Sequence, residues 1–579
     1  MFNKGKIIQI KNKIISWVKD NYWLLLILSL AFGLRWYGIY FDYPYGVSQI
    51  WDESYITNTL DMLQYKSIFT PIQVQTSFFL PILYMPGTIL RLVYLAVVNG
   101  LYNLNDLKEF IVVSGSGTIN IVARFYSVAF GTASTFLIYK IYLLIFKNKK
   151  IVYFATLAYA VSFIPVYLSH WGKSHISVVF FLLLSLYFAL KYERDKNIKD
   201  FYWCSLFATL SFLAHYYGIF TLIYPAYTFL LNRKNFKIKQ IVYPLMMFVA
   251  LVFVFYILNW KGMYNQYDNA AFLFIQTGFK GMFPVSFWFK TYYLLRDAFR
   301  VEYVFIGLFF VMFLINLKRL FTDRLLRYIT LGIVANYLFL SFIIVGPEMA
   351  RLLLVFITLT VPLGAALLME RLENLKLKNA YLIIFSILII IPNLYFTGKW
   401  LAILNNNTRK DLVVWAEKNL KKDENIYTFD LYFDALLSYQ AALFHKEENK
   451  VLYSKKLDYI ISHKAEFENK GLNIFYDIGN NRYKELGGKN TKYFVISYWV
   501  DTNKPTRLAD GYDRQGARKV IDQIRQYHEI KLEKTFYPTE NKDLIRDGIW
   551  SYSNNPTEWK NFLYLDKDGP FVEVYKVIK

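Results

Sequence analysis

The stretch YWLLLILSLAFGLRWYGIY at 22–40, followed by WDESY at 51–55, decides the fold of this chain. The first part is a continuous apolar run of the length that crosses a bilayer, about 20 residues. It is too long for a cleaved signal peptide and has no small-residue cleavage site, so we expect it to remain as a signal anchor. The acidic pair Asp52 and Glu53 follows at the membrane boundary. Because an ionised carboxylate is costly to desolvate, the pair indicates either a hydrated cavity with chemistry to perform or a solvated loop start.

Similar apolar runs recur along the chain, which is 55% hydrophobic and 20% aromatic. This composition predicts a polytopic membrane protein. The net charge is +23, but the 29 Lys and Arg against 26 Asp and Glu after residue 400 contribute only +3 of it. The surplus therefore lies in short membrane loops, where it encodes orientation and does not indicate nucleic-acid binding. The single cysteine, Cys204, excludes an intrachain disulfide and argues against a thiolate metal cluster.

The basic loops predict the topology. If each basic cluster faces the cytoplasm, the apolar segments alternate consistently, with the amino terminus inside and the carboxy terminus outside a cell membrane. The clusters are Lys4–Lys19, Lys147–Lys150, Lys191–Lys199, Arg233–Lys239, Lys318–Arg327 and Arg371–Lys378. The predicted spans, about eleven, lie near 22–40, 119–146, 151–168, 175–191, 201–216, 218–232, 241–259, 303–317, 326–345, 351–369 and 380–397.

One apolar segment, Phe78–Val98, does not fit this alternation. It contains two prolines and Arg91, and as a span it would move Lys147–Lys150 outside and invert every later segment. We therefore interpret it as a helix lying in or dipping into the outer interface, within a first outer loop at 42–118.

The composition changes to a soluble pattern near residue 401. An amphipathic helix at Thr408–Leu420 and the short β-type runs after it predict an α/β domain of roughly 170 residues. We therefore expect a transmembrane domain at 1–400 and an extracytoplasmic α/β domain at 401–579. The predicted strands are Asn425–Phe429, Leu457–Ile461, Leu472–Tyr476, Tyr493–Ser497 and Phe571–Val577.

This topology gathers the unusual polar residues on the outer face. The basic cytoplasmic loops show no nucleotide-binding fingerprint, since Gly115-Ser116-Gly117 is not followed by a phosphate-cradle pattern and no Walker-type loop occurs. An enzyme of this kind must use a donor delivered in the membrane. The outer polar segments are Asp52–Glu53, Ser169–His175, Lys261–Arg300 and Gly346–Arg351.

Several ordered pieces of the chain carry a family resemblance. They are Arg35 with Asp52–Glu53, Phe79–Tyr84, Ala123–Ser127 with Gly131–Thr132, Ser169–Trp171, Phe212–Gly218, Arg351–Leu353 with Pro362, and Thr408–Arg409 with Trp415 and Asn419. Together they resemble the lipid-carrier-dependent glycosyltransferases of the GT-C superfamily. The most similar branches are the dolichyl-phosphate-mannose protein mannosyltransferases and the bacterial lipid A aminoarabinose transferases. The resemblance extends across the spans to about residue 400 and into the start of the outer domain.

Two positions depart from the family pattern. The Pro-Pro-Leu segment is reduced to Leu80-Pro81-Ile82, and Gln75-Thr76-Ser77 stands where relatives have a preceding basic or histidine residue. His175 occupies a place where many relatives carry an acidic residue. These departures leave the donor sugar and any metal requirement open.

The chemistry of transfer from a polyprenyl phosphosugar suggests roles for the outer residues. An acceptor hydroxyl must lose its proton as it attacks the anomeric carbon, and Asp52 at headgroup level is the candidate general base, a role that the resemblance supports. Glu53 projects about 100° away around a helix, and we assign it a supporting role. Arg351 is the first candidate for binding the departing phosphate and Lys173 the second, because fixed cations stabilise the developing charge. For both, anchoring at the interface is the alternative.

The remaining polar residues have less specific predictions. Arg35 and Arg124 are expected to brace the outer loop against the carboxylates, in a structural or a catalytic ion pair. His170 is counted among the substrate-binding residues. With His175 and Glu53 it can share a divalent metal, although the spacing does not match a zinc site and no cofactor is certain. His215 is predicted to pack against its tyrosine neighbours.

We therefore predict an α-helical polytopic membrane protein with a GT-C-like fold of about 11 transmembrane helices, interfacial helices in the first outer loop, and a C-terminal soluble α/β domain. Its expected function is inverting transfer of a monosaccharide from a polyprenyl-phosphate-linked sugar to a glycan, lipid or protein acceptor hydroxyl at the outer face. Membrane lipid is a further partner, and nucleic acid is not.

Two alternatives stay open. An oligosaccharyltransferase would be favoured by a second acidic pair in a later outer loop, where 261–300 offers only Asp268 and Asp297. A non-catalytic lipid-glycan transporter or scaffold should carry polar residues through the middle of several spans, and often internal repeats.

Overall fold

The computed structural model divides into two compact units. The first comprises Met1–Ile39, Asp52–Thr88 and Val122–Gly398, and the second comprises Tyr40–Trp51, Ile89–Ile121 and Lys399–Lys579. The predicted domain boundary at 400/401 stays a prediction. The structure describes residues 16, 18–40, 80–103, 106–107, 110–111, 117–258, 285–343, 353–375, 379–404, 406–421, 424–428, 439, 441–443, 460–462, 464, 473–476, 491–499, 512–537, 567 and 571–578.

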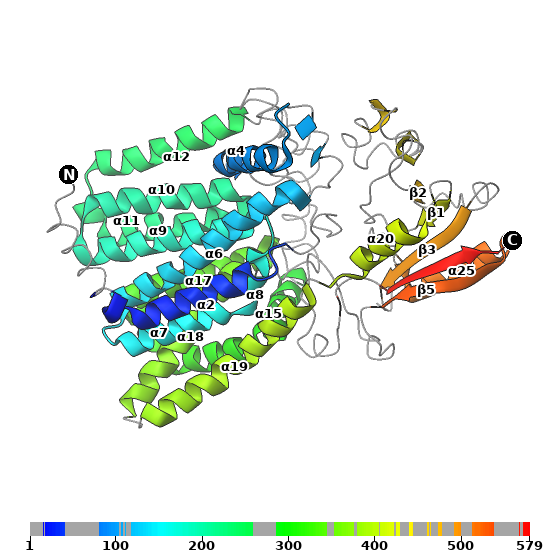
Figure 1. Cartoon of the computed structure of the whole chain (residues 1–579). Coiled ribbons are helices and arrows are strands. Elements are labelled where there is room, and N and C mark those ends of the chain that lie inside the picture. Colours follow the sequence, from blue (N-terminus) through cyan, green and yellow to red (C-terminus); the bar gives the residue numbers. More distant parts are fainter. Residues whose placement is uncertain are drawn as a thin grey trace. The chain divides into compact units, whose positions relative to one another are not determined.

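The first unit is built of helices that lie side by side with their long axes roughly aligned (Figure 1). Within it, α9 packs along α10, while α7 packs against both α2 and α18. The helices up to residue 404 are α2 (Tyr22–Trp36), α4 (Leu80–Asn99), α6 (Gly117–Ile145), α7 (Lys149–Val161), α8 (Phe163–Ser169), α9 (His175–Asp195), α10 (Ile198–Ala214), η2 (Tyr216–Leu222), α11 (Ile223–Asn232), η3 (Arg233–Asn235), α12 (Ile238–Leu258), α15 (Val285–Ile315), α16 (Leu317–Thr322), α17 (Arg324–Ile343), α18 (Leu354–Asn374) and α19 (Asn379–Leu404).

Several of these helices have the length and composition of membrane spans. Five described helices are long and apolar enough to cross a bilayer, or six if the bent pair α7 and α8 is one span. One of the five is Ile82–Asn99 in α4, the segment predicted to lie in the interface. The predicted count of about eleven spans and the interfacial position of α4 therefore stay predictions.

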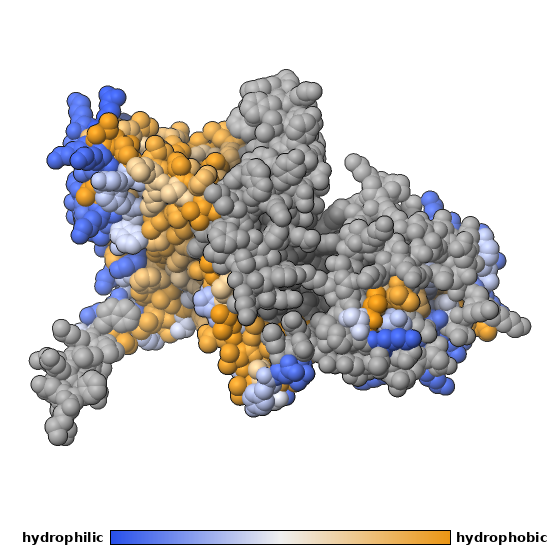
Figure 2. All heavy atoms as spheres, turned by 90° about the horizontal axis from the view of Figure 1, so that it is seen from above, coloured by the Kyte–Doolittle hydropathy of each residue, from blue (hydrophilic) through white to orange (hydrophobic). Residues whose placement is uncertain are grey.

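The outer surface of the helices is apolar, as a lipid-facing surface requires. Figure 2 shows hydrophobic side chains covering the helices beside a rim of hydrophilic side chains at one end. On α12, Leu245 and Met246 are exposed, and on α19 Ile383 and Leu388 are exposed. The hydrophobic effect cannot favour such residues in water, so their exposure fits a bilayer environment.

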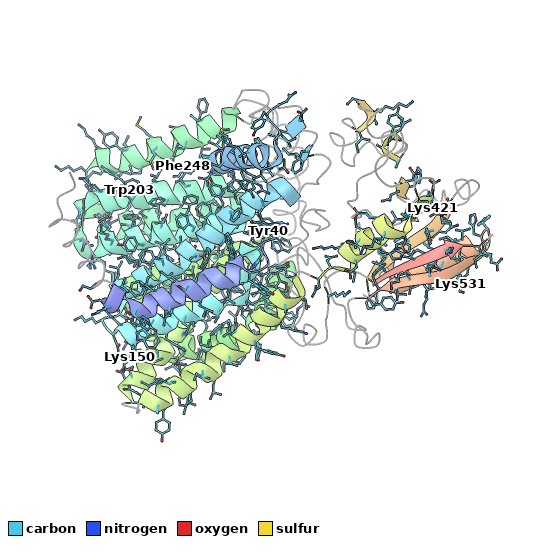
Figure 3. All side chains as sticks on the ribbon, in the orientation of Figure 1. Tyr40, Lys150, Trp203, Phe248, Lys421 and Lys531 are labelled. Carbon is cyan, nitrogen blue, oxygen red and sulfur yellow. The ribbon has the colours of Figure 1, made fainter. Side chains whose placement is uncertain are left out.

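The basic loops gather at one end of the bundle, as the predicted topology requires. Asn148 begins α7 by accepting a hydrogen bond from the amide of Lys150, and Lys150, labelled in Figure 3, forms an ion pair with Glu373 at 3.2 Å. Asn197 caps α10 in the same way. At this end the buried carboxylate of Glu193 contacts the cations of Lys196 and Arg324 at 2.8 and 2.5 Å. The pairs of Lys150 with Glu373 and of Arg324 with Glu193 join helix ends that are far apart in the sequence.

The second unit contains the predicted α/β domain. Its mixed sheet has the strand order β2-β1-β3-β6-β5, with β4 paired to β3. Strands β1 and β2, β1 and β3, and β3 and β4 are parallel, whereas β6 runs antiparallel to both β3 and β5. The elements are α20 (Thr408–Asn419), β1 (Asn425–Thr428), β2 (Asn473–Tyr476), β3 (Thr491–Trp499), β4 (Tyr512–Asp513), α25 (Arg514–Arg525), β5 (Ile530–Phe536) and β6 (Phe571–Val577).

Helices pack on both faces of this sheet, α20 on one face and α25 on the other. Along β6, Val572 and Val574 enter the core under α20, and Phe571 and Tyr575 enter the core under α25. This alternation follows from the two-residue period of a strand. Lys531 (Figure 3) lies on the neighbouring strand β5, which was not predicted.

One predicted strand is wrong where the structure describes it. Ile460 and Ile461, expected to end the strand Leu457–Ile461, are helical. Residues 457–459 lie outside the described chain. A short apolar run suits a buried helix as well as a strand, so periodicity alone could not separate the two.

Candidate functional site

Four predicted site residues fall in the described chain, and three elements bring them together. Arg35 lies in the last turn of α2, Arg124 lies in α6, and His170 and Lys173 lie between α8 and α9. Nη1 of Arg124 donates to the carbonyl oxygen of Ile39 over 3.1 Å, and Nε2 of His170 lies 2.7 Å from the carbonyl oxygen of Tyr37. The backbone after α2 is therefore held both by α6 and by the turn after α8.

The predicted catalytic residues Asp52 and Glu53, and the predicted phosphate ligand Arg351, lie outside the described residues. Their roles stay predictions. Arg35 and Arg124 were expected to brace the first outer loop, and Arg124 does contact the backbone that leads into it.

Helix α6 lies close to both α2 and α8 at Gly131. A Cβ atom at this position would overlap the Oγ of Ser169 and lie 2.9 Å from Nε of Arg35. Glycine is needed here for close approach. One turn earlier, the Oγ of Ser127 donates to the carbonyl oxygen of Trp171 over 2.8 Å, so α6 fixes the turn after α8 at two points.

The helix leading into that turn is broken. Helix α7 ends at Val161 and α8 begins at Phe163, with an angle of 52° between them. Pro165 explains the break, because it has no N–H to donate to the carbonyl of Val161 and its ring would collide with that carbonyl. Proline is tolerated in the first turn of a new helix. Helix α8 therefore takes a new direction and carries Ser169 and His170 toward α2 and α6.

Side chains of distant helices bond the carbonyl groups that the break releases. Nη1 of Arg35 donates to Ala160 over 3.1 Å and to Ala31 over 3.0 Å. Oγ1 of Thr397, in α19, donates to the carbonyl oxygen of Val161 over 3.2 Å. A guanidinium suits this place because the C-terminal end of α7 carries a partial negative charge.

A buried carboxylate bonds the other side of the break. Oε1 of Glu302 accepts from the Oγ of Ser162 over 2.6 Å and from the amide of Ile164 over 3.1 Å. Its second oxygen accepts from the side-chain amide of Asn393 in α19. Glu302 lies where α15 kinks, at φ −130° and ψ 39°. An anion complements the positive end of α8, and these partners of Glu302 in the described chain are all neutral donors.

Glu302, Asn393 and Thr397 are absent from the residues predicted from the sequence. The predicted span begins at 303 and leaves Glu302 in a loop, whereas α15 continues through it. One signal was available: a carboxylate directly before a long apolar run. An acidic residue at membrane depth is a functional or structural site by default.

Arg35 is fully buried, and in the described chain hydrogen bonds and a cation–π contact stabilise its charge. Its guanidinium donates to the two carbonyls named above and lies 5.9 Å from the ring centroid of Tyr159. Its Nε and Nη2 atoms have no hydrogen-bond partner among the described residues. A buried cation with unused donors fits an anionic partner.

Lys173 is held close to the turn. The side chain is 2% exposed, and its ammonium lies 4.9 Å from the ring centroid of Trp171. A cation over an aromatic face is stabilised by the ring quadrupole. This burial does not fit a snorkelling anchor, whose ammonium reaches water.

The histidines form two separate groups. Both ring nitrogens of His170 face carbonyl oxygens, those of Val166 and Tyr37, at 2.9 and 2.7 Å. His215 instead packs on Tyr217, with ring centroids 4.3 Å apart, as predicted, and His175 lies beside it at 5.4 Å. Across the described chain no group of three His, Cys, Asp or Glu side chains could hold a metal ion. Glu53, the third ligand of the metal site considered above, is not among the described residues.

One family of known proteins matches the part of the chain that contains α6, α7 and α8. Residues 111–260 match the family model of dolichyl-phosphate-mannose-protein mannosyltransferases. The predicted resemblance to the mannosyltransferases is thereby confirmed over this segment. The matched segment contains Arg124, Gly131, His170 and Lys173, and so includes α6 and the broken helix. Proteins of that family are named for the transfer of mannose from a dolichyl-phosphate carrier to protein. Arg35 and Glu302 lie outside the match.

Two solved structures are similar to the chain. They are ArnT from Cupriavidus metallidurans bound to undecaprenyl phosphate, at 11% identity, and the same protein in the apo state, at 12%. Each has a TM-score of 0.42 and is covered over 93% of its length, with 82% and 83% of the present chain aligned. None of the curated proteins compared matches the chain.

Proposed function

We propose that this chain is an inverting glycosyltransferase that moves a monosaccharide from a polyprenyl-phosphate donor to an acceptor hydroxyl at the outer face of the cell membrane. The observation that carries the proposal is the family match over residues 111–260, which contains three of the four described site residues. Within that segment, Arg124 and His170 contact the backbone at Ile39 and Tyr37, which leads into the first outer loop.

The reaction needs a base and a cationic site. Asp52 takes the proton of the acceptor hydroxyl while its oxygen attacks the anomeric carbon. The bond from that carbon to the phosphate oxygen breaks, and its electron pair leaves with the polyprenyl phosphate, so the configuration inverts. Arg351 and Lys173 stabilise the charge on the phosphate. Glu53 supports the base.

The described residues supply positioning in this scheme. Arg124 and His170 hold the backbone at Ile39 and Tyr37, and the chain reaches Asp52 thirteen residues after Ile39. Arg35 keeps Nε and Nη2 unused among the described residues, and in this scheme they pair with an acidic residue of the loop. Positioning of this kind matters because displacement by about 1 Å can cost about 10² in rate.

The test of the base is Asp52→Asn, which keeps the shape of the side chain and removes its proton affinity. We expect transfer from a labelled polyprenyl phosphosugar to fall by at least about 10²-fold, with the protein still folded. Turnover by the purified variant close to that of the wild type would remove Asp52 from the mechanism.

The proposed orientation can be tested independently. Lys149, Lys237 and Tyr37 are exposed, and Cys204 is buried, so single cysteines can be placed at the three positions in a Cys204→Ala background. An impermeant thiol reagent added outside should label position 37 and leave positions 149 and 237 unlabelled. Outside labelling at 149 would invert the scheme and favour Phe78–Val98 as a true span.

A further inference from the structure

A polar cleft lies in the C-terminal domain, between α25 and the sheet face formed by β3 and β6. Its volume is about 320 Å³ and polar atoms make up most of its lining. This volume is at the lower end of the range of small-molecule sites, about 300 to 1,000 Å³. The sheet contributes Tyr498, Glu573 and Tyr575 to the lining, and α25 contributes Arg518, Asp522 and Arg525. We name this the Glu573 cleft.

Glu573 occupies a place that the strand pattern reserves for an apolar side chain. Phe571 and Tyr575, two residues before and after it on β6, belong to the core under α25. The register pairs Glu573 with Ile496 of β3, which is also a core residue. A carboxylate at such a position costs free energy to desolvate unless it is fully hydrogen-bonded.

Three phenol groups offset this cost. Oε1 of Glu573 accepts from the hydroxyls of Tyr498 and Tyr537 at 3.0 and 2.8 Å, and Oε2 accepts from the hydroxyl of Tyr575 at 2.5 Å. Burial, reinforced by Glu573, raises the pKa of Tyr575, so this hydroxyl keeps its proton and donates. A carboxylate has about four acceptor sites, so one site on Oε2 is left for a ligand hydroxyl.

The charges around the cleft identify the kind of ligand. Arg518 and Arg525 on the helix are balanced by Asp522 and Glu573, so the lining carries no net charge. An anionic ligand would meet two carboxylates and a cationic ligand would meet two guanidinium groups. An apolar ligand would leave the polar lining desolvated and unpaired. A neutral molecule with many hydroxyl groups satisfies carboxylate, phenol and guanidinium together.

We propose that the Glu573 cleft binds a neutral sugar unit of a glycan acceptor. The proposal rests on the proposed glycosyl transfer and specifies its acceptor class. Glu573 accepts a hydrogen bond from a sugar hydroxyl, and Arg518 donates to another from the exposed wall of α25. The residues that hold the acceptor glycan are thus different from those assigned to the reaction.

The experiment measures sugar binding by saturation-transfer NMR, using the full-length protein in nanodiscs. The probes are the methyl glycosides of glucose, galactose, mannose and N-acetylglucosamine, with inorganic phosphate as a charged comparison. Two variants change the cleft, Glu573→Gln and Arg518→Gln. Two matched controls change neighbours outside its lining: Lys519→Gln on α25, and Tyr493→Phe on the α20 face of β3.

We expect at least one glycoside to bind the wild type and to bind about tenfold more weakly to both cleft variants, because each loses a charge-assisted hydrogen bond. The two controls should bind as the wild type does. Arg518 is exposed, so its substitution tests the proposal even if Glu573→Gln unfolds the domain. Absence of binding by all four glycosides, equal binding by cleft variants and wild type, or a preference for phosphate would each overturn the proposal.

The same measurement on Asp52→Asn separates this proposal from the proposed function. Binding in the cleft should be unchanged in that variant, whereas transfer should be lost. A wild-type protein that transfers sugar but binds none of the four glycosides would reject the cleft proposal alone. Glycoside binding by a wild-type protein that shows no transfer activity would reject the reaction alone.

Discussion

Glu193 and Glu302 are both buried glutamates of the helical unit, but their surroundings differ in kind. Glu193 lies at the basic end of the bundle and contacts Lys196 and Arg324, whose side chains are 41% and 50% exposed. It also accepts hydrogen bonds from two buried neutral donors, the side-chain amide of Asn232 and the hydroxyl of Tyr328. Glu302 lies at the break between α7 and α8, and its partners are a hydroxyl, a backbone amide and a side-chain amide.

The difference predicts that one glutamate stabilises the helical unit, while the other also positions the residues of the proposed site. The two cations beside Glu193 can be hydrated if the carboxylate is removed, because both reach solvent, so only the neutral donors Asn232 and Tyr328 would lose a buried partner. The donors around Glu302 cannot be hydrated, since Ser162 and Asn393 are buried. Moreover, α8 leads directly into Ser169 and His170, whereas Glu193 has no contact with the proposed site in the described chain. We therefore expect Glu302 to affect turnover and Glu193 to affect stability alone.

The largest expected effect is that of Glu302→Leu. Leucine offers no acceptor, so three buried donors lose their partner at about 1–3 kcal/mol each before relaxation. The thermal unfolding temperature should fall by several degrees. Turnover of the protein that stays folded should fall by at least about 10²-fold, because α8 shifts the residues it carries.

Glu302→Gln should lower stability and turnover by less than Glu302→Leu does. Its oxygen can still accept from Ser162 or Ile164, but its amide then meets the donating amide of Asn393. Both variants can be measured by thermal unfolding in detergent and by transfer of labelled sugar. Wild-type turnover by well-folded Glu302→Leu would show that the break does not position the site.

A smaller effect is expected at Gly131, where α6 meets Arg35 and Ser169. The added methyl group of Gly131→Ala should cost about 1–3 kcal/mol through overpacking. Turnover should fall by about tenfold as the turn after α8 is displaced. Gly33→Ala in α2 is the matched control, because no atom lies within 4 Å of the place that its new methyl group would take. Equal turnover by the two alanine variants would contradict the role given to the contact at Gly131.

The smallest effect on turnover is expected for Glu193→Gln. It removes the ion pairs with Lys196 and Arg324 and should lower stability by about 1–3 kcal/mol, the range for hydrogen bonds to charged groups. Turnover should stay close to the wild type. The stability of the wild type should also fall more with added salt than that of the variant, because half-exposed pairs are screened. A loss of turnover comparable to that of Glu302→Gln would remove the distinction between the two regions.

Much of the fold follows from local patterns. The helices α2, α6, α9 and α18 lie close to the predicted spans, and β1, β2, β3 and β6 match predicted strands. Strand β5 (Ile530–Phe536) was missed because lysine and glutamate interrupt its apolar residues. The strand is also largely exposed, and both features weaken the apolar signal of a strand. The break at Ser162 was also missed, although Pro165 marks it, because the apolar run continues through both helices.

For the candidate site, the sequence identified several residues but not the contacts between them. His170, Lys173, Arg35 and Arg124 were found from the sequence because charged and polar residues at the ends of apolar runs are conspicuous. The bonds that they form were not predictable, and neither was Glu302, whose partner Ser162 lies 140 residues away in the chain.

The sequence by itself determined which segments are apolar enough for a membrane, which loops are basic, and that an α/β domain follows, because hydropathy and periodicity are properties of neighbouring residues. Only the tertiary structure shows that Glu302 and Arg35 bond the backbone groups released at the break between α7 and α8. It also shows that Gly131 allows α6 to approach Arg35 and Ser169, and that Glu573 lines a cleft with α25. Each of these depends on packing between segments distant in sequence, where a hydrogen bond forms only if both partners reach bonding distance and water is excluded.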